Sequence, residues 1–220
     1  MSLKDIKINF LGDSITEGAG ASCVENRYVS RIALDYGAIC RNYGIGGTRI
    51  ARQTSLSECA SGDRDFGSRV DEMDADADVI VIFGGTNDYG HGDAPIGNFC
   101  DTTPDTFYGA LHALYTSVIN KYPDSLVVVL TPLHRVGENN PNGENGRKSS
   151  PAAPLKTYCD AIKLVAEYYS IPVLDLYAAS GIQPNLQILR EKFTVDGLHP
   201  NDAGHKKIAK MIAEFIKSHL

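Results

Sequence analysis

The stretch that indicates the fold of this chain is IKINFLGDSITEG, residues 6–18. It opens with a short, mostly apolar run, which is typical of a strand buried in a sheet. The run ends at Gly12 and is followed by the polar residues Asp13 and Ser14. A strand that ends in this way places the Ser14 hydroxyl at the carboxyl edge of the sheet. The alternative is that Ser14 and Glu17 form a helix capping box, in which the serine only satisfies a backbone N–H.

Similar apolar runs recur along the chain and alternate with helical patterns. They predict strands at residues 6–11, 38–42, 79–83, 126–130 and 172–176. Apolar residues at three- and four-residue spacing predict helices over residues 104–121, 154–169 and 202–218. This alternation favours an α/β fold, a three-layer α/β/α sandwich with a parallel sheet of about five strands. In such folds ligands bind beyond the carboxyl ends of the strands.

Composition limits the kind of protein and the kind of partner. A chain of 220 residues with 43% hydrophobic content suits one domain over residues 1–220. The formal net charge of -6 disfavours nucleic-acid and membrane partners and suits a small molecule. The five cysteines are widely spaced without ligand pairing, so we expect reduced thiols. No signal-like segment precedes the first strand, which predicts a cytoplasmic location, and no pattern indicates an oligomeric state.

A reactive serine needs a base, and the segment Asp196-Gly197-Leu198-His199-Pro200 offers one. Serine is a weak nucleophile until a positioned histidine removes its proton, and a carboxylate usually holds that histidine in the right tautomer. An Asp three residues before a His in a turn can fold back onto one ring nitrogen and leave the other free. The alternative is that Asp196 and His199 are ordinary turn and cap residues before the last helix.

Two further strand ends offer donors for an oxygen that becomes negative during acyl transfer. Gly47 follows the second strand, where the absence of a Cβ lets its N–H approach a substrate closely. Asn87 follows the third strand and could donate from its side-chain amide. The alternative is that both segments are simple turns.

Four motifs together resemble the blocks of the SGNH hydrolase superfamily, the GDSL-like esterases and acylhydrolases. They are Gly12-Asp13-Ser14, Gly47, Gly85-x-Asn87-Asp88 and Asp196-x-x-His199, in this order across nearly the whole chain. The resemblance implies a flavodoxin-like fold with Ser14 as nucleophile, His199 as general base and Asp196 as its orienting acid. It also implies an oxyanion hole made by the N–H groups of Ser14 and Gly47 and by the Asn87 side chain. Ile15 replaces the leucine that names the GDSL subgroup.

Several other residues are candidates for contacts with a ligand. Asp13 is expected to be a structural acceptor or to contact substrate, and His134, after the fourth strand, is a second candidate for substrate contact. Asp88, His91 and Asp93 carry oxygen and nitrogen groups that can bind a metal ion, but they lack a recognised ligand spacing. We therefore expect no metal and no cofactor. The long polar connections over residues 86–103 and 131–153 are candidate lids or substrate walls.

The expected activity is hydrolysis of a carboxylic ester through an acyl-serine. Polar residues between positions 139 and 147 suggest a hydroxyl-rich substrate, such as an acetylated carbohydrate. A lysophospholipase or thioesterase is the alternative within the same chemistry, although the sequence shows no lid with an extended apolar face. A carbohydrate-binding module that has the fold without the activity is the non-enzymatic alternative.

Overall fold

The computed structural model describes residues 2–55, 60–148 and 153–220. Within these ranges the strands are β1 (Lys7–Gly12), β2 (Ile39–Gly44), β3 (Val79–Phe83), β4 (Leu126–Leu130) and β5 (Val173–Leu174). They form one sheet in the spatial order β2-β1-β3-β4-β5, and all neighbouring pairs are parallel. This is the strand order of flavodoxin-like folds. The predicted α/β fold with a parallel sheet of five strands is confirmed.

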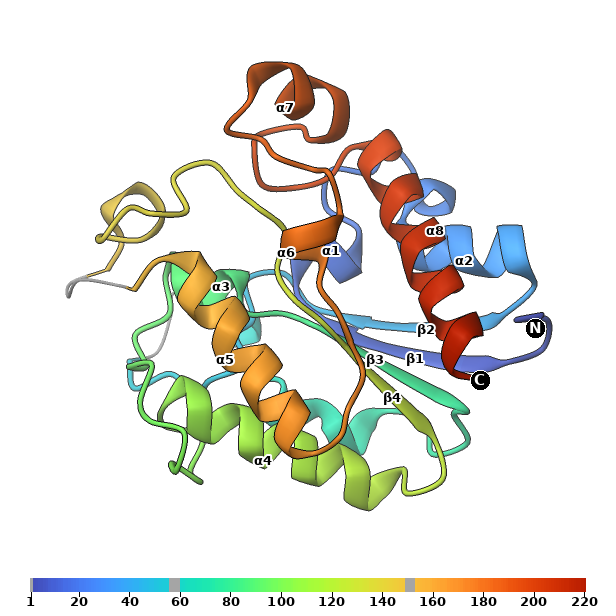
Figure 1. The fold of residues 1–220 in the computed structure, drawn as a ribbon, viewed down its shortest axis with the longest axis horizontal. Helices are drawn as coiled ribbons and strands as arrows, with labels where there is room; N and C mark the ends of the chain where they lie inside the picture. The colour runs from blue at the N-terminus through green and yellow to red at the C-terminus, as the bar shows by residue number, and fades with distance from the viewer. Residues whose placement is uncertain (1, 56–59, 149–152) are drawn as a thin grey trace.

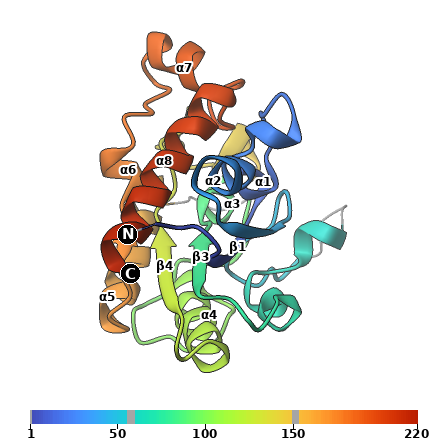
Figure 2. The same cartoon turned by 90° about the vertical axis from the view of Figure 1, so that its right-hand side faces the viewer.

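Helices cover both faces of the sheet (Figure 1). One face carries α2 (Tyr28–Tyr36) and α8 (Asp202–His219), and the other carries α4 (Phe107–Lys121) and α5 (Leu155–Tyr168). Figure 2 shows α2 and α4 on opposite sides of the strands. Within β3, Val79, Val81 and Phe83 pack toward the first pair of helices, while Ile80 and Ile82 pack toward the second. Because both faces are covered, the strand reads as a continuous apolar run.

Shorter helices occupy the connections between the strands and the long helices. They are α1 (Ser14–Glu17), α3 (Thr86–Gly90), α6 (Leu176–Ala179), α7 (Gln187–Phe193), and the 3₁₀ turns η1 (Val24–Asn26), η2 (Ala60–Asp63), η3 (Gly67–Glu72) and η4 (Glu144–Gly146). The first residues of the candidate lid over residues 86–103 therefore form a helix, α3, and not a loop. The other, over residues 131–153, contains η4, and its residues 149–152 lie outside the described part of the chain.

The fifth strand is shorter than the sequence predicts. The apolar run predicts a strand over residues 172–176, but β5 ends at Leu174. The Asp175 carboxylate accepts a hydrogen bond from the Ala178 N–H at 3.1 Å and so caps α6. A capped helix start directly after Leu174 ends the strand, and Leu176 is buried as a helical residue.

Asp13 shapes the connection from β1 to α1. It is the N-cap of the helix, and its Oδ1 accepts a hydrogen bond from the Ile15 N–H at 3.0 Å. Ser14 is therefore the first helical residue and not the cap, which differs from the capping-box alternative. Glu17, the other member of that motif, accepts a hydrogen bond from the Gly46 N–H at 2.9 Å instead. The cap leaves the Ser14 side chain available for other contacts.

The Asp13 carboxyl is buried, with 1% of its surface exposed. Burial is the main influence and raises the pKa of Asp13 to about 6, although the Ile15 N–H and the charges of His199 and Arg69 act in the opposite direction. Buried in this way, Asp13 faces the protein interior, and its contact with substrate stays a prediction. The structure gives it the other expected role, that of a structural acceptor.

In the described residues, no helix combines the length and the apolar character needed to cross a bilayer. Four of the cysteines, Cys23, Cys40, Cys100 and Cys159, are free thiols. Cys59 lies outside the described residues.

The raised pKa of Asp13 predicts a pH-dependent gain in stability for Asp13→Asn. Between about pH 4 and pH 6 the folded protein keeps a proton on Asp13 that the unfolded chain has lost, so this group's contribution to stability falls as pH rises. Asparagine cannot ionise, so the variant avoids the free-energy cost of ionising a buried carboxyl. We expect the free energy of unfolding of the variant, relative to the wild type, to rise by about 2 kcal/mol between pH 4.5 and 7.5. Urea denaturation at several pH values measures this difference, and a constant difference would contradict the assignment.

Candidate active site

Ser14, His199 and Asp196 lie in one chain of hydrogen bonds at the carboxyl edge of the sheet. The Ser14 Oγ is 3.1 Å from the His199 Nε2, although the two residues are 185 positions apart in the sequence. The His199 Nδ1 is 2.7 Å from the Asp196 Oδ2. An ionised carboxylate can only accept, so Nδ1 carries the ring proton and Nε2 is left to accept from the Ser14 hydroxyl. The structure thus brings these three predicted residues together.

A tight turn holds Asp196 against His199. The Asp196 Oδ1 accepts hydrogen bonds from the backbone N–H groups of Leu198 and His199, at 2.9 and 2.7 Å. Gly197 adopts the left-handed conformation, with φ of +86°, that this turn requires. Burial raises the pKa of Asp196, but the hydrogen bonds from the side chain and backbone of His199 and from Leu198 outweigh it, and its pKa lies below the ordinary value. Asp196 is therefore ionised near neutral pH.

The turn after β2 lies beside Ser14. A Cβ built on Gly46 would be 3.7 Å from the Ser14 Cβ and 2.8 Å from the Glu17 carboxylate. Gly47 has a φ of +76°, and the space where its side chain would project is open to 4 Å. Among the described residues we find no acceptor for the Gly47 N–H. This turn can therefore offer a backbone donor close to the serine.

Asn87 lies at the start of α3, at the end of β3, and its side chain is almost fully buried. Its Nδ2 donates to the Thr48 carbonyl at 2.9 Å, and its Oδ1 is 3.2 Å from the His91 Nε2. An amide nitrogen carries two hydrogens, so one N–H remains after the bond to Thr48. The contact with Thr48 also ties α3 directly to the turn that contains Gly47.

Asp88 and Arg69 fasten the loops that surround the site. The Asp88 carboxylate accepts hydrogen bonds from the Ile50 and Ala51 N–H groups at 3.0 and 2.9 Å. Arg69, on η3, donates to the carbonyls of Tyr43 and Gly12 and to the Thr48 hydroxyl. Arg69 is a lone arginine outside any motif, so no local sequence signal marks it as part of the site. One buried guanidinium thus connects the ends of β1 and β2 with the residue after Gly47.

His134, the second candidate for substrate contact, is engaged within the protein. Its Nδ1 is 2.9 Å from the Glu138 carboxylate, and its ring lies 3.8 Å from the Tyr177 ring between centroids. Its neighbour Arg135 is buried, with its guanidinium donating to the Thr86 carbonyl and pairing with Glu144. The structure shows no direct contact between His134 and the Ser14 cluster, and contact with substrate stays a prediction.

The three residues considered as metal ligands have separate partners. Asp88 accepts from backbone amides, His91 contacts Arg49 and Asn87, and Asp93 accepts from Thr54 and Ser55. In the ranges that the structure describes, no group of three or more His, Cys, Asp or Glu side chains is arranged to hold a metal ion.

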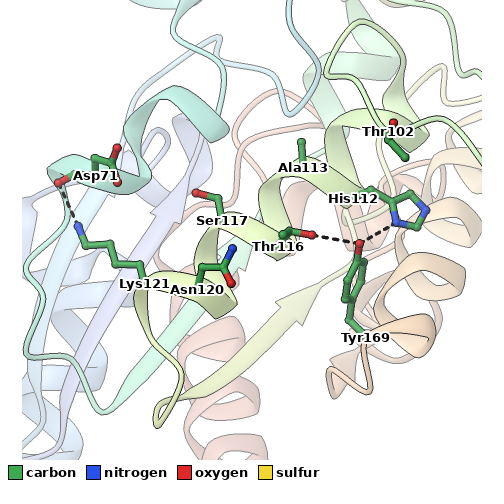
Figure 3. A pocket seen from close by; sticks show the side chains of 9 residues that line it. All are labelled: Asp71, Thr102, His112, Ala113, Thr116, Ser117, Asn120, Lys121 and Tyr169. Carbon is green, nitrogen blue, oxygen red and sulfur yellow. Dashed lines mark hydrogen bonds between the residues drawn. The ribbon is translucent and has the colours of Figure 1, made fainter.

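A cavity of about 820 Å³ lies along α4 and does not include the Ser14 cluster (Figure 3). Its lining comes mainly from α4, with Asp71, Thr102 and Tyr169 from neighbouring segments. As Figure 3 shows, the Tyr169 hydroxyl contacts His112 and Thr116 across the cavity wall. None of Ser14, Asp196 and His199 is among its lining residues, so this cavity is separate from the cluster at the carboxyl edge of the sheet.

Comparisons with known proteins agree with this geometry. A family model described as the GDSL-like lipase/acylhydrolase family matches residues 10–207. A solved structure of a protein from Lactobacillus plantarum is 30% identical, with a TM-score of 0.82 and coverage of 100% of this chain and 99% of that one. No protein of curated function matches the chain.

Two more distant structures share the fold. The lipase/acylhydrolase from Enterococcus faecalis is 24% identical, with a TM-score of 0.64 and coverage of 98% and 97% of the two chains. The M. smegmatis aryl esterase is 20% identical, with a TM-score of 0.66 and coverage of 98% and 100%. The match of the family model to most of the chain is the decisive finding. The chain belongs to the GDSL-like lipase/acylhydrolase family and is a hydrolase that acts on ester bonds.

Proposed function

We propose that this protein hydrolyses carboxylic esters through an acyl-serine intermediate on Ser14. The observation that carries the proposal is the unbroken hydrogen-bond chain from the Ser14 Oγ through the His199 ring to the Asp196 carboxylate. In this arrangement His199 is the general base and Asp196 holds its tautomer. The N–H groups of Ser14 and Gly47 and the Asn87 amide form the oxyanion hole.

The reaction proceeds in two steps. The His199 Nε2 takes the hydroxyl proton as the Ser14 Oγ bonds to the ester carbonyl carbon, and the hole holds the negative oxygen of the tetrahedral intermediate. The bond to the alcohol oxygen then breaks, and that oxygen takes the proton from Nε2. In the second step Nε2 takes a proton from water, whose oxygen attacks the acyl carbon. The carbon–Oγ bond breaks, Ser14 regains the proton, and the acid leaves.

A small acyl group on a hydroxyl-rich molecule, such as an acetylated carbohydrate, is the substrate class we propose. The segment after β4 supports it, because this segment runs from the His199 turn to α3. The Val136 N–H donates to the Gly197 carbonyl, and a Cβ on Gly143 would be 2.4 Å from the Gly90 carbonyl oxygen. Exposed polar side chains lie on this segment, namely Asn139, Asn140, Asn142, Asn145 and Arg147. These side chains can donate and accept hydrogen bonds with the hydroxyl groups of a substrate.

A longer acyl chain is the second candidate, and exposed apolar residues beside the His199 turn favour it. Leu186, the N-cap of α7, is 56% exposed, and Ile188 on α7 is 75% exposed. This helix leads directly into the turn. Val195 is 60% exposed within the turn, and Val136 is 42% exposed beside it. Such residues could receive the apolar chain of a lysophospholipase or thioesterase substrate.

Reaction with a fluorophosphonate tests the role of Ser14. Because an activated serine attacks phosphorus as it attacks an ester, we expect intact-mass spectrometry to show one adduct on the wild type. Ser14→Ala should show none, and His199→Ala should react much more slowly. Ser117 lies on α4, and Ser117→Ala is the matched control. This variant should form the same adduct as the wild type. A folded wild-type protein without an adduct would contradict the proposal and favour a carbohydrate-binding protein without activity.

The acyl chain length separates the two substrate classes. With p-nitrophenyl acetate and decanoate we expect kcat/KM to be at least about tenfold higher for the acetate. Dominant activity on the decanoate would contradict the small-acyl proposal. In that case Ile188→Asn should lower the decanoate rate alone, because it removes exposed apolar surface from the helix that leads into the His199 turn. Leu164→Asn, at an exposed leucine on α5, is the matched control and should leave both rates unchanged.

A further inference from the structure

We propose that His91 and Arg49 are positioning residues that hold the Asn87 amide with its NH₂ group toward the oxyanion site. They do so through a neutral His91 ring whose proton is on Nε2. This inference rests on the proposed function, because it gives Asn87 the role of a donor to the developing negative oxygen. The structure supplies the argument as a sequence of hydrogen bonds from Arg49 to Asn87.

The first step concerns the His91 ring. The Arg49 Nη1 lies 3.0 Å from the His91 Nδ1. A guanidinium has donors only, so the Nδ1 of His91 must accept and cannot carry a proton. In the neutral ring the single proton is then on Nε2. Burial, followed by the positive charge of Arg49, lowers the pKa of His91 to about 4, which is consistent with a neutral ring near pH 7.

The second step concerns the Asn87 amide. The His91 Nε2 lies 3.2 Å from the Asn87 Oδ1, and as a donor it requires an oxygen there. The Thr48 carbonyl, 2.9 Å from the Asn87 Nδ2, requires a donor on the other side. If the amide were rotated by 180°, its NH₂ group would face the N–H of His91, so that two donors would meet. Its oxygen would face the Thr48 carbonyl, so that two acceptors would meet. The network therefore selects one of the two amide orientations.

The third step concerns the anchor of the network. The Arg49 side chain is 5% exposed, and its Nη2 donates to the Gly62 carbonyl and to the Asp63 carboxylate, both at 3.1 Å. With these contacts the guanidinium cannot turn away from His91 without losing an ion pair in a buried place. The Asn87 amide is thus held by a chain of three side chains, Asp63, Arg49 and His91.

Holding the amide in place matters because a donor contributes most when it is already oriented as charge develops. The bond to Thr48 uses one Asn87 N–H, and the fixed rotation leaves the second free for the oxyanion. The same bond restrains the residue after Gly47, the other proposed donor. His91 and Arg49 would then raise kcat without touching the substrate.

A double-mutant cycle tests the inference. Asn87→Ala removes the donor, and we expect kcat on p-nitrophenyl acetate to fall about 10²- to 10³-fold. His91→Phe keeps a ring but loses the hydrogen bond, and kcat should fall about tenfold with KM nearly unchanged. Added to Asn87→Ala, the His91 substitution should have less than about a twofold effect, because it acts through Asn87. The same tenfold loss in both backgrounds would overturn the inference.

Matched controls separate positioning from a general loss of structure. His112 on α4 also uses both ring nitrogens, with the Tyr169 hydroxyl and the Phe99 carbonyl. His112→Phe should therefore lower thermal stability and leave kcat unchanged. An equal kcat loss for His112→Phe and His91→Phe would assign the effect to stability and overturn the inference.

The ring tautomer gives a test that is independent of activity. Long-range ¹H–¹⁵N NMR spectra of the wild type should show His91 with a protonated Nε2 and a bare Nδ1 at neutral pH. Arg49→Met should change the His91 signals, while Arg52→Met, at an arginine with 58% side-chain exposure, should not. A proton on the His91 Nδ1 in the wild type would overturn the inference, even if the fluorophosphonate labels Ser14 as expected. Loss of all labelling at Ser14 would instead reject the proposed function.

Discussion

The site depends on buried polar side chains that bond to the backbone of the loops behind it. Asp13 caps α1, Asp88 binds two N–H groups of the loop after β2, and Arg69 binds carbonyls at the ends of β1 and β2. Buried backbone groups that lack partners are costly, so these bonds give each loop one stable path. The serine and the glycine turn are thus held by loops whose buried backbone groups these side chains satisfy.

Two carboxylates near the site differ because their surroundings differ. Asp13 is buried, and burial raises its pKa to about 6, while Asp196 is half exposed and has its pKa lowered by hydrogen bonds from His199 and Leu198, which outweigh burial. An ionised carboxylate can only accept, so it holds the proton-bearing Nδ1 of His199 and leaves Nε2 to accept from the serine. The environments therefore separate a structural carboxyl from one suited to orient a base.

The surroundings of the serine combine polar and apolar surface. A polar segment connects the His199 turn to α3, and apolar side chains are exposed on α7 and on the turn itself. A small ester with a polar alcohol would use the first surface, and a long acyl chain would use the second. Membership of the family is compatible with both, since its description includes lipases and acylhydrolases.

The sequence by itself determined the fold class, the positions of the four longer strands to within about two residues, and the grouping of Ser14, Asp196 and His199. The fold class and the strand positions follow from apolar runs and turn residues, whereas the grouping of the three site residues follows from the resemblance of the four motifs to a known family. Only the tertiary structure decided the early end of β5, the burial of Asp13, and the contacts of Arg69, Arg49 and His91. Such contacts join residues from different loops, and no local pattern encodes them, because each bond forms only after folding brings its donor and acceptor together.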